Sequence, residues 1–292
     1  MNASVGNGLG ITTRRLVHVY RSGGVDVAAL AGVDLVVEPG ECVGLLGPSG
    51  AGKSTLMALL GGLFRPSAGQ VLIGGTDVGA ADDRALDALR AGPVALLVQG
   101  AGRNLLADRT PRRNVAFARS AALAAGRAVP DVEAVLAEVG LLDRADDRLD
   151  ALSPGELQLL ALAVALAPRP GLLLADEPTS QLDHEARDRV VQTLLQVNRD
   201  HATTVVLVTH DPDVARARAR TVTIRDGRIG GEGRHGEEFA VVTADGFLPL
   251  PGPVVAGLPP GTLVSIHRTG DTYEIRPAGP AAGEGAGRNP SA

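Results

Sequence analysis

Nine consecutive residues carry the clearest chemical signal in this sequence, because residues 47–55 read G-x-x-x-x-G-K-S-T. Glycines in such a stretch let the backbone curl, so that successive N–H groups point inward and hold phosphate oxygens. The pattern assigns Lys53 to the β- and γ-phosphates and the Ser54 hydroxyl to Mg²⁺. The candidate nucleotide-binding residues are therefore Gly47, Pro48, Ser49, Gly50, Ala51, Gly52, Lys53, Ser54 and Thr55.

Lys53 is also distinguished by composition. It is the one lysine among 28 basic residues, and the other 27 (28 − 1) are arginine. An ammonium group is a compact charge, whereas a guanidinium group is a planar fork with a different shape. A single lysine at this position indicates that the site needs the ammonium.

The neighbouring segments must position this loop. Residues 41–46 form an apolar run short enough for a buried strand, and residues 56–60 favour a helix. A helix that begins at the loop adds its positive end to the phosphate site. A chance glycine-rich turn is the alternative, and the strand–loop–helix context argues against it.

Two adjacent carboxylates, Asp176 and Glu177, follow the apolar run 172–175. An acid at the end of a buried strand suits Mg²⁺, so Asp176 is a candidate metal ligand. Adjacent side chains on a strand point to opposite faces. We therefore expect Glu177 to be free to orient an attacking water.

Three further polar residues are candidates because of their positions. Gln99 ends the apolar run 94–98, and His210 follows the buried strand predicted at 205–208. Ligands gather at the carboxyl ends of strands in α/β proteins. Tyr20 lies in an expected strand, where it is either an adenine-stacking residue or an ordinary strand tyrosine. The residues alone leave both readings open.

Two helix starts complete the pattern. Residues 153–156 read S-P-G-E, a capping box with Ser153 at the N-cap and Glu156 three residues later. Asp183 ends the stretch 180–183 and is expected to cap a long helix over about 184–199. Taken alone, both patterns indicate helix starts and nothing more.

Composition sets limits on the class of protein. A chain of 292 residues predicts about two domains. Cys42 is the one cysteine, which excludes an internal disulfide and favours a reducing compartment. The net charge of −5 argues weakly against a nucleic-acid partner. The start of the chain lacks signal-peptide features, and the longest apolar-rich run, 157–168, is too short to cross a bilayer.

These motifs, in this order, resemble the ATP-binding subunit of an ABC transporter over about residues 11–230. The resemblance rests on Walker A at 47–55, a Q-loop at Gln99, a signature at 152–156, Walker B at 172–177, a D-loop at 180–183 and a switch at His210. Glu156 and the stretch 104–106 are most similar to the lipoprotein-release, macrolide-efflux and cell-division branch.

The resemblance implies an α/β fold, a P-loop NTPase. It has a RecA-like core, an N-terminal antiparallel β subdomain and a helical subdomain inserted at about 100–168. Beyond the ATPase we expect a linker at 231–238, a small C-terminal β module at 239–277 and a disordered tail at 278–292. Short strands with turn signals give the module a weak similarity to AbrB-like swapped-hairpin barrels. Acids outnumber bases there, which favours a regulatory or dimerising role over DNA binding.

The resemblance also assigns roles within one chain. Tyr20 stacks on adenine, and Gln99 touches Mg²⁺ and the attacking water and senses the membrane subunit. Glu177 is the general base, Asp176 the metal acid, and His210 the γ-phosphate switch.

In that family two copies sandwich two ATP molecules, so other roles fall on the partner. Ser153 and Gly155 bind the γ-phosphate held by the second copy, and Glu156 and Asp183 belong to the same nucleotide-binding set. Partners are thus a homodimer or paired ATPase subunit and a separate transmembrane permease, with no nucleic acid expected.

Three departures from the family pattern stand out. Pro154 replaces the first glycine of the signature and removes one backbone N–H. Leu157 and Leu159 replace a glutamine and an arginine, and the Q-loop is lengthened by residues 100–103. Pro154 is expected to weaken the contact across the dimer, and the longer loop affects the choice of coupling partner.

The sequence therefore predicts an ATP-hydrolysing subunit, with ATP and Mg²⁺ as cofactors, on the cytoplasmic face of a membrane. It would energise a separate permease. Two alternatives remain open at this stage. One is a soluble ABC-type ATPase in cell-envelope division or mechanical signalling. The other is a nucleotide-dependent DNA-binding regulator, which the charge of −5 disfavours.

Overall fold

The computed structural model describes residues 8–22, 24–209, 220–234, 237–242, 246–250, 252–258 and 261–277. The chain divides into two units, Met1–Phe247 and Leu248–Ala292.

The first sheet of unit one is antiparallel and has the strand order β2-β1-β4-β5. Its strands are β1 (Ile11–Ser22), β2 (Val25–Val37), β4 (Ala68–Ile73) and β5 (Thr76–Asp77). This is the expected N-terminal antiparallel subdomain. Strand β2 runs through Gly32 without a break, and its pairing with β1 is adjusted by shifts of register. A φ of 92° at Gly32 lets the strand bend there without ending.

The second sheet holds the P-loop and has the order β11-β10-β9-β3-β8-β7-β6. Its strands are β3 (Cys42–Leu46), β6 (Val94–Leu97), β7 (Leu172–Asp176), β8 (Thr204–Val208), β9 (Arg220–Arg225), β10 (Arg228–Arg234) and β11 (Glu237–Ala240). Five of these strands are parallel to one another, namely β3, β6, β7, β8 and β9. Strands β10 and β11 extend the sheet beyond β9 through antiparallel pairing. Because β8 lies between the P-loop strand and β7, the core is RecA-like.

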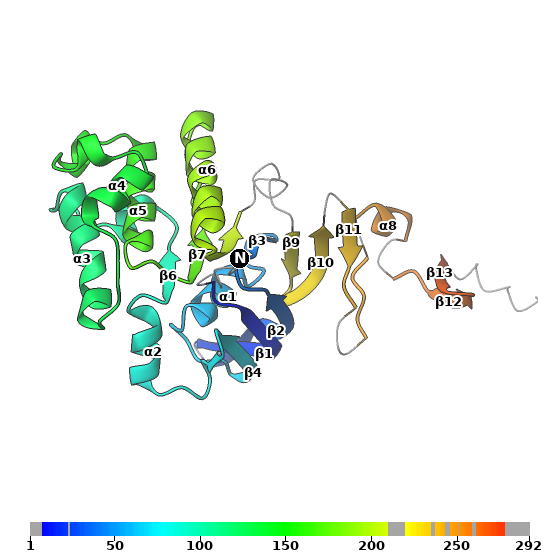
Figure 1. Ribbon diagram of the computed structural model, residues 1–292. Helices are drawn as coiled ribbons and strands as arrows, with labels where there is room; N and C mark the ends of the chain where they lie inside the picture. The colour runs from blue at the N-terminus through cyan, green and yellow to red at the C-terminus, as the bar shows by residue number, and fades with distance from the viewer. Residues whose placement is uncertain are drawn as a thin grey trace, which may run out of the picture. The chain divides into compact units, whose positions relative to one another are not determined.

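Helices surround this sheet on both sides. They are α1 (Lys53–Leu60), α2 (Asp83–Arg90), α3 (Pro111–Ala124), α4 (Val132–Glu138), α5 (Pro154–Leu166) and α6 (His184–His201), with short 3₁₀ turns at Ala101–Asn104, Leu142–Arg144 and Leu149–Ala151. Figure 1 shows α3, α4 and α5 grouped beyond β6, whereas α1 lies between the central sheet and strands β1, β2 and β4. The inserted helical subdomain expected from sequence is therefore present.

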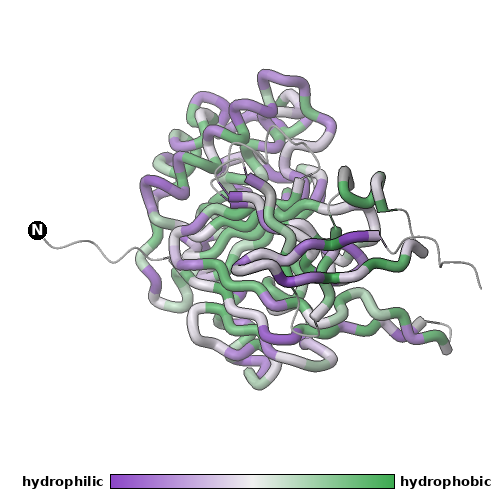
Figure 2. The backbone as a smooth tube through the Cα atoms, turned by 90° about the vertical axis from the view of Figure 1, so that its right-hand side faces the viewer, coloured by the Kyte–Doolittle hydropathy of each residue, from purple (hydrophilic) through white to green (hydrophobic). Residues whose placement is uncertain are grey.

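The alternation of side chains along the strands divides the core into two. On β7, Leu173 and Ala175 pack with α3 to α6, whereas Leu172 and Leu174 pack with α1 and the antiparallel sheet. In Figure 2, hydrophobic segments gather near the centre of the fold, and hydrophilic segments lie mostly on its outer turns. Both faces of the sheet are covered, which explains why its strands read as continuous apolar runs.

The end of unit one differs from the prediction. Residues 231–238 were expected to be a linker, but most of them lie in β10 and β11, and the division falls between Phe247 and Leu248. The glycines there serve close packing. A Cβ at Gly233 would lie 2.3 Å from Oγ1 of Thr221 on β9. A glycine-rich segment can thus be a strand when its neighbour leaves no room for side chains.

Unit two is small. It contains α8 (Gly252–Gly257) and an antiparallel hairpin of β12 (Val264–Thr269) and β13 (Thr272–Pro277). The AbrB-like resemblance stays a prediction, and the expected disordered tail at 278–292 lies outside the described residues. In the described ranges of the chain, no helix combines the length and apolar character that crossing a membrane requires.

Candidate functional site

The P-loop joins β3 to α1 and is closely surrounded by backbone. Gly47, Gly50 and Gly52 have positive φ angles of 146°, 79° and 99°. A Cβ at Gly47 would lie 2.2 Å from the carbonyl oxygen of Ile224, and one at Gly52 would lie 2.4 Å from that of Ala29. Glycine is required at both positions because of the backbone conformation and the lack of space.

Lys53 folds over the loop that precedes it. Its Nζ donates to the carbonyl oxygens of Gly47 at 2.7 Å and Pro48 at 2.8 Å, and the residue is only 8% exposed. Among the residues that the structure describes, no side chain caps the N-terminus of α1 at Gly52. The ammonium and the helix N–H groups thus converge on one place, which suits a phosphate group.

A cleft of about 670 Å³ extends from the P-loop. It is lined by Ala29, Gly47, Pro48, Ser49, Gly50, Gly52, Lys53, Ser54, Thr55, Gln99 and Glu177. The structure therefore brings together the phosphate loop, the Q-loop amide and the second Walker B carboxylate, which are far apart in sequence. This is the arrangement that the resemblance implied, although the individual roles stay predictions.

Ser54 and Asp176 meet beside the cleft. The Ser54 hydroxyl donates to Oδ2 of Asp176 at 3.2 Å. Burial raises the pKa of the Asp176 carboxyl, the bond from Ser54 opposes this, and the charge of Glu177 adds to it. One hydroxyl and one carboxylate are the protein ligands that a P-loop Mg²⁺ needs, since phosphate oxygens and water supply the rest. In the described ranges, no cluster of three or more His, Cys, Asp or Glu offers an alternative metal site.

Glu177 reaches the cleft by a route that sequence did not predict. It lies just past β7, with a φ of 47° that non-glycine residues rarely adopt. Its Oε2 accepts a hydrogen bond from Nε2 of Gln99 at 2.8 Å. Strand alternation was therefore the wrong argument, because the turn after the strand sets the direction of this side chain. Such local strain is typical of functional positions.

The Q-loop is held by a residue whose positioning role sequence reasoning missed. The Asn104 side chain accepts from the backbone N–H of Val98 at 3.0 Å and donates to the carbonyls of Val98 at 2.9 Å and Gly100 at 3.0 Å. These bonds close the lengthened loop on either side of Gln99. Asn114 then fixes the following segment by accepting from the N–H of Leu106 at 2.7 Å. An asparagine shortly after the Q-loop was the available signal.

Tyr20 lies next to the P-loop helix. Its hydroxyl is 3.2 Å from Oγ1 of Thr55, and its ring makes an edge contact with His18 at a centroid distance of 4.8 Å. Phe64 contacts both rings. Tyr20 is 38% exposed, and its role in stacking on adenine stays a prediction.

The signature residues lie at the start of α5 and do not line the cleft. Ser153 and Glu156 form the predicted capping box, with the Ser153 N–H donating to Glu156 at 2.8 Å and lowering the pKa of that carboxylate. Gly155 is buried, and a Cβ there would lie 2.6 Å from Cβ of Ala186 on α6. Gly155 therefore also allows two helices to approach closely.

Leu159 is buried in the core of the helical subdomain and Leu157 packs against it, so both substitutions fit apolar surroundings. Asp183 caps α6 by accepting from the N–H of Ala186 at 2.8 Å. The stretch from Thr179 to Asp183 lines a second cleft of about 310 Å³, which Glu177 also lines. His210 lies outside the described residues, so its switch role is untested.

Comparison with known proteins gives a consistent result. Residues 30–180 match the family model described as ABC transporter. The chain is 39% identical over 216 residues to a lipoprotein-releasing system ATP-binding protein LolD 1 of Rhodospirillum rubrum, covering 74% of this chain and 95% of that protein. It is also 39% identical over 221 residues to the methionine import ATP-binding protein MetN of Corynebacterium diphtheriae, with 75% of this chain and 64% of MetN covered.

Solved structures agree with the sequence comparisons. The dimeric ATP-binding cassette MJ0796, in a post-hydrolysis state bound to ADP and Pi, superposes with a TM-score of 0.69 and 31% identity. The match covers 77% of this chain and 98% of that structure. The matches to LolD 1 and to MJ0796 each leave about a quarter of this chain unmatched.

The fold and the cleft define a P-loop ATPase with a RecA-like core. Within that class, the chain belongs to the ABC transporter family. It is an ATP-binding cassette that hydrolyses ATP.

We predict that Asn104→Ala lowers kcat about 10-fold while changing ATP affinity less than about twofold, because Asn104 positions Gln99 without lining the cleft. Steady-state hydrolysis and ATP titration provide the two readouts. Arg103→Ala is the matched control, since Arg103 is the adjacent residue and is exposed. Equal losses in both variants would contradict the positioning role.

We also predict that Asp176→Asn raises the Tm of the ligand-free chain by a few degrees at neutral pH. The raised pKa means that the folded state binds more protons than the unfolded state between the two pKa values. Stability is therefore lost as pH rises through that window, and the amide removes this loss. The gain should vanish at acid pH, below the unfolded-state pKa.

Thermal unfolding across pH measures this effect. Asp150→Asn is the control, because a hydrogen bond from Arg148 lowers the pKa of Asp150. That control should show no gain at neutral pH. A pH-independent difference for Asp176→Asn would contradict the account.

Proposed function

We propose that this chain is the ATPase subunit of a transporter, works as a pair of cassettes and energises a separate membrane-spanning permease on the cytoplasmic face of the membrane. The observation that carries the proposal is the single cleft in which Lys53, Gln99 and Glu177 converge. Relatives named as ATP-binding subunits of lipoprotein-releasing systems support the transporter context.

The chemistry within one chain follows from the residues of the cleft. The P-loop N–H groups and Lys53 hold the β- and γ-phosphates, and the third N–H of the Lys53 ammonium stays available for phosphate beside its bonds to the carbonyls of Gly47 and Pro48. Ser54 and Asp176 would hold Mg²⁺, and the ion would supply positive charge to neutralise the transferred phosphoryl group. The Glu177 carboxylate accepts the proton of the attacking water, and Gln99 orients that water beside it.

The need for a second copy follows from where the signature lies. Ser153 and Gly155 are on α5, away from the lining of the cleft in their own chain. They contribute to hydrolysis only when a second copy presents them, as the dimeric state of the MJ0796 cassette illustrates. Pro154 removes one donor from this set, so we expect the Ser153 hydroxyl and the Gly155 N–H to carry the contact.

The permease contact would lie beyond the Q-loop. Gln99 touches Glu177 at one end of this segment, and the chain then leads to Leu106 and, on α3, Phe117. These two apolar side chains are 39% and 65% exposed. A permease element that pressed on this surface would act on Gln99 through the loop that Asn104 closes.

We predict that Glu177→Gln lowers ATP turnover at least about 100-fold while ATP binding is retained. The amide keeps the size of the side chain and removes the base, so an ATP-bound dimer should accumulate. Hydrolysis assays with light scattering in ATP and Mg²⁺ measure both effects. Turnover close to the unsubstituted chain would refute the role of Glu177.

Glu185→Gln is the matched control. It makes the same change at an exposed position in the first turn of α6, outside the lining of the cleft. Co-purification with one membrane protein from detergent-solubilised membranes tests the permease. Recovery of the full chain without a membrane partner would contradict that part of the proposal.

A further inference from the structure

The hairpin of unit two presents one apolar face. Its register pairs Ile266 with Ile275 and Arg268 with Tyr273. Side chains alternate across a strand, so Val264, Ile266, Tyr273 and Ile275 share one face. Val264, Ile266 and Tyr273 are 42%, 64% and 69% exposed. We call these four residues the hairpin face.

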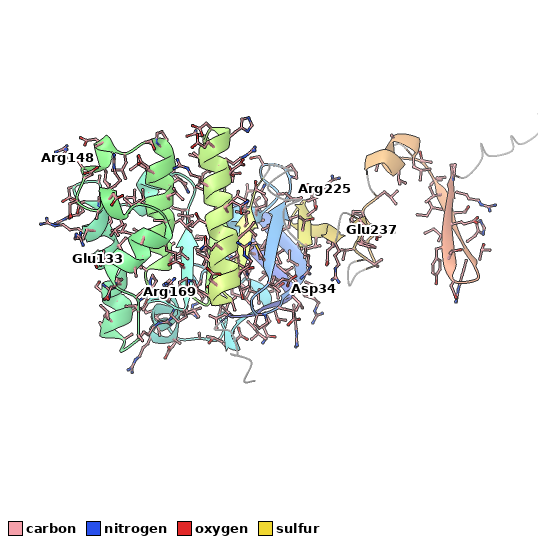
Figure 3. The ribbon with its side chains drawn as sticks, turned by 45° about the horizontal axis from the view of Figure 1, so that its top comes forward. Asp34, Glu133, Arg148, Arg169, Arg225 and Glu237 are labelled. Carbon is pink, nitrogen blue, oxygen red and sulfur yellow. The ribbon has the colours of Figure 1, made fainter. Side chains whose placement is uncertain are left out.

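The opposite side of the hairpin is suited to water. It carries Ser265, His267, Glu274 and Arg276, and these side chains satisfy one another. His267 Nε2 lies 3.1 Å from the Ser265 hydroxyl, and Arg276 Nε donates to Glu274 at 3.0 Å. Figure 3 shows side chains of β12 and β13 projecting from both sides of the ribbon. One side of the hairpin is thus polar and suited to water, whereas the hairpin face is apolar and suited to contact with another apolar surface.

In the part of unit two that the structure describes, the hairpin lacks a second layer that would pack on its hydrophobic face. Two strands alone are marginally stable in water, and a further layer on the hydrophobic face is needed for independent stability. A unit as small as Leu248–Ala292 buries little surface by itself. Exposed apolar patches of this kind mark contact sites.

We propose that the hairpin face is covered by the hairpin face of a second copy of this chain. Its centre is the uncharged pair Ile266 and Ile275, so two such faces can stack as two sheets. Arg268 is the charged residue on the same side of the hairpin, and it lies near the turn. Its Nη2 is 3.9 Å from Oδ1 of Asp271. A twofold axis that lies between the two faces and runs perpendicular to the strands places the two Arg268 side chains at opposite ends, where their like charges do not meet.

Tethering makes so small an interface effective, and this step rests on the pairing of cassettes proposed above. Four residues per copy bury far less than the roughly 800 Å² per partner of a standard interface. Two hairpins attached to paired cassettes, however, meet at an effective concentration in the range of about millimolar. Hairpin contact and ATP-dependent pairing then strengthen each other, because coupling between two binding events is reciprocal.

Single cysteines introduced into the full chain test this contact. Ile266→Cys places a thiol at the centre of the hairpin face, and Ser265→Cys places one on the adjacent residue, which points to the opposite side. Both variants keep the native Cys42, so its contribution is common to them. Under mild oxidation with ATP and Mg²⁺, we expect Ile266→Cys to form at least about 10-fold more cross-linked dimer than Ser265→Cys.

A second pair of variants addresses affinity. Ile266→Glu should weaken the ATP-dependent dimer about 10-fold in Kd, whereas Ser265→Glu should change it less than about twofold. Sedimentation of the full chain measures both. Equal cross-linking of the two cysteine variants, or equal dimerisation of the two glutamate variants, would overturn the inference.

Two further outcomes would also overturn it, each for a distinguishable reason. If the Ser265→Cys chain pairs with ATP but Ile266→Cys does not cross-link, the hairpin inference fails and the pairing of cassettes stands. If no variant shows ATP-dependent pairing, both fail. Protection of the Ile266→Cys thiol from alkylation only when membranes are added would show that a membrane component covers the face.

Discussion

The structure depends on a close approach between the P-loop backbone and two neighbouring carbonyl groups. Gly47 lies against the carbonyl of Ile224 on β9, and Gly52 against that of Ala29 on β2. The N–H of Gly227 also donates to the carbonyl of Ala51 at 3.2 Å. The loop is thus fixed to both sheets of unit one at once. Any side chain at these glycines would separate the sheets and deform the cleft.

The catalytic side of the cleft is held differently. Gln99 and Glu177 touch through one side-chain hydrogen bond, and Asn104 closes the Q-loop through three more. Lys53 donates to two carbonyls of the loop and has a third N–H for a phosphate oxygen. A phosphate loop fixed by backbone packing therefore faces polar groups that can exchange partners. This division suits an enzyme whose nucleotide binds and leaves while a partner acts on its Q-loop.

Local patterns in the sequence predicted most of the fold and much of the site. The P-loop, the strand before Asp176 and the capping box of Ser153 and Glu156 depend on a few adjacent residues, and each is found as expected. The contact of Gln99 with Glu177 joins distant segments, and no local pattern predicted it; the family resemblance gave both residues roles at the attacking water without predicting their hydrogen bond.

What sequence missed depends on tertiary contacts. The φ of Glu177 is set by the turn that follows β7, and the bonds of Asn104 reach back four to six residues to the backbone of the same loop. Gly155 was assigned to a phosphate, although its surroundings show that it also lets α5 approach Ala186. The glycines of residues 231–233 suggested a linker, but pairing with β9 and β11 makes them a strand. None of these features has a periodic signal that a single sequence displays.

ATP binding to a Lys53→Arg variant tests the central claim most directly, which is that the P-loop cleft holds phosphate through a compact ammonium. Apart from Lys53, every Lys or Arg position in the chain holds arginine. The Lys53 Nζ lies 2.7 Å from the carbonyl oxygen of Gly47 and 2.8 Å from that of Pro48. Calorimetric titration with ATP and Mg²⁺ should show at least about a 10-fold weaker Kd, with the folded state retained by thermal unfolding. An unchanged Kd in the folded variant would contradict the account.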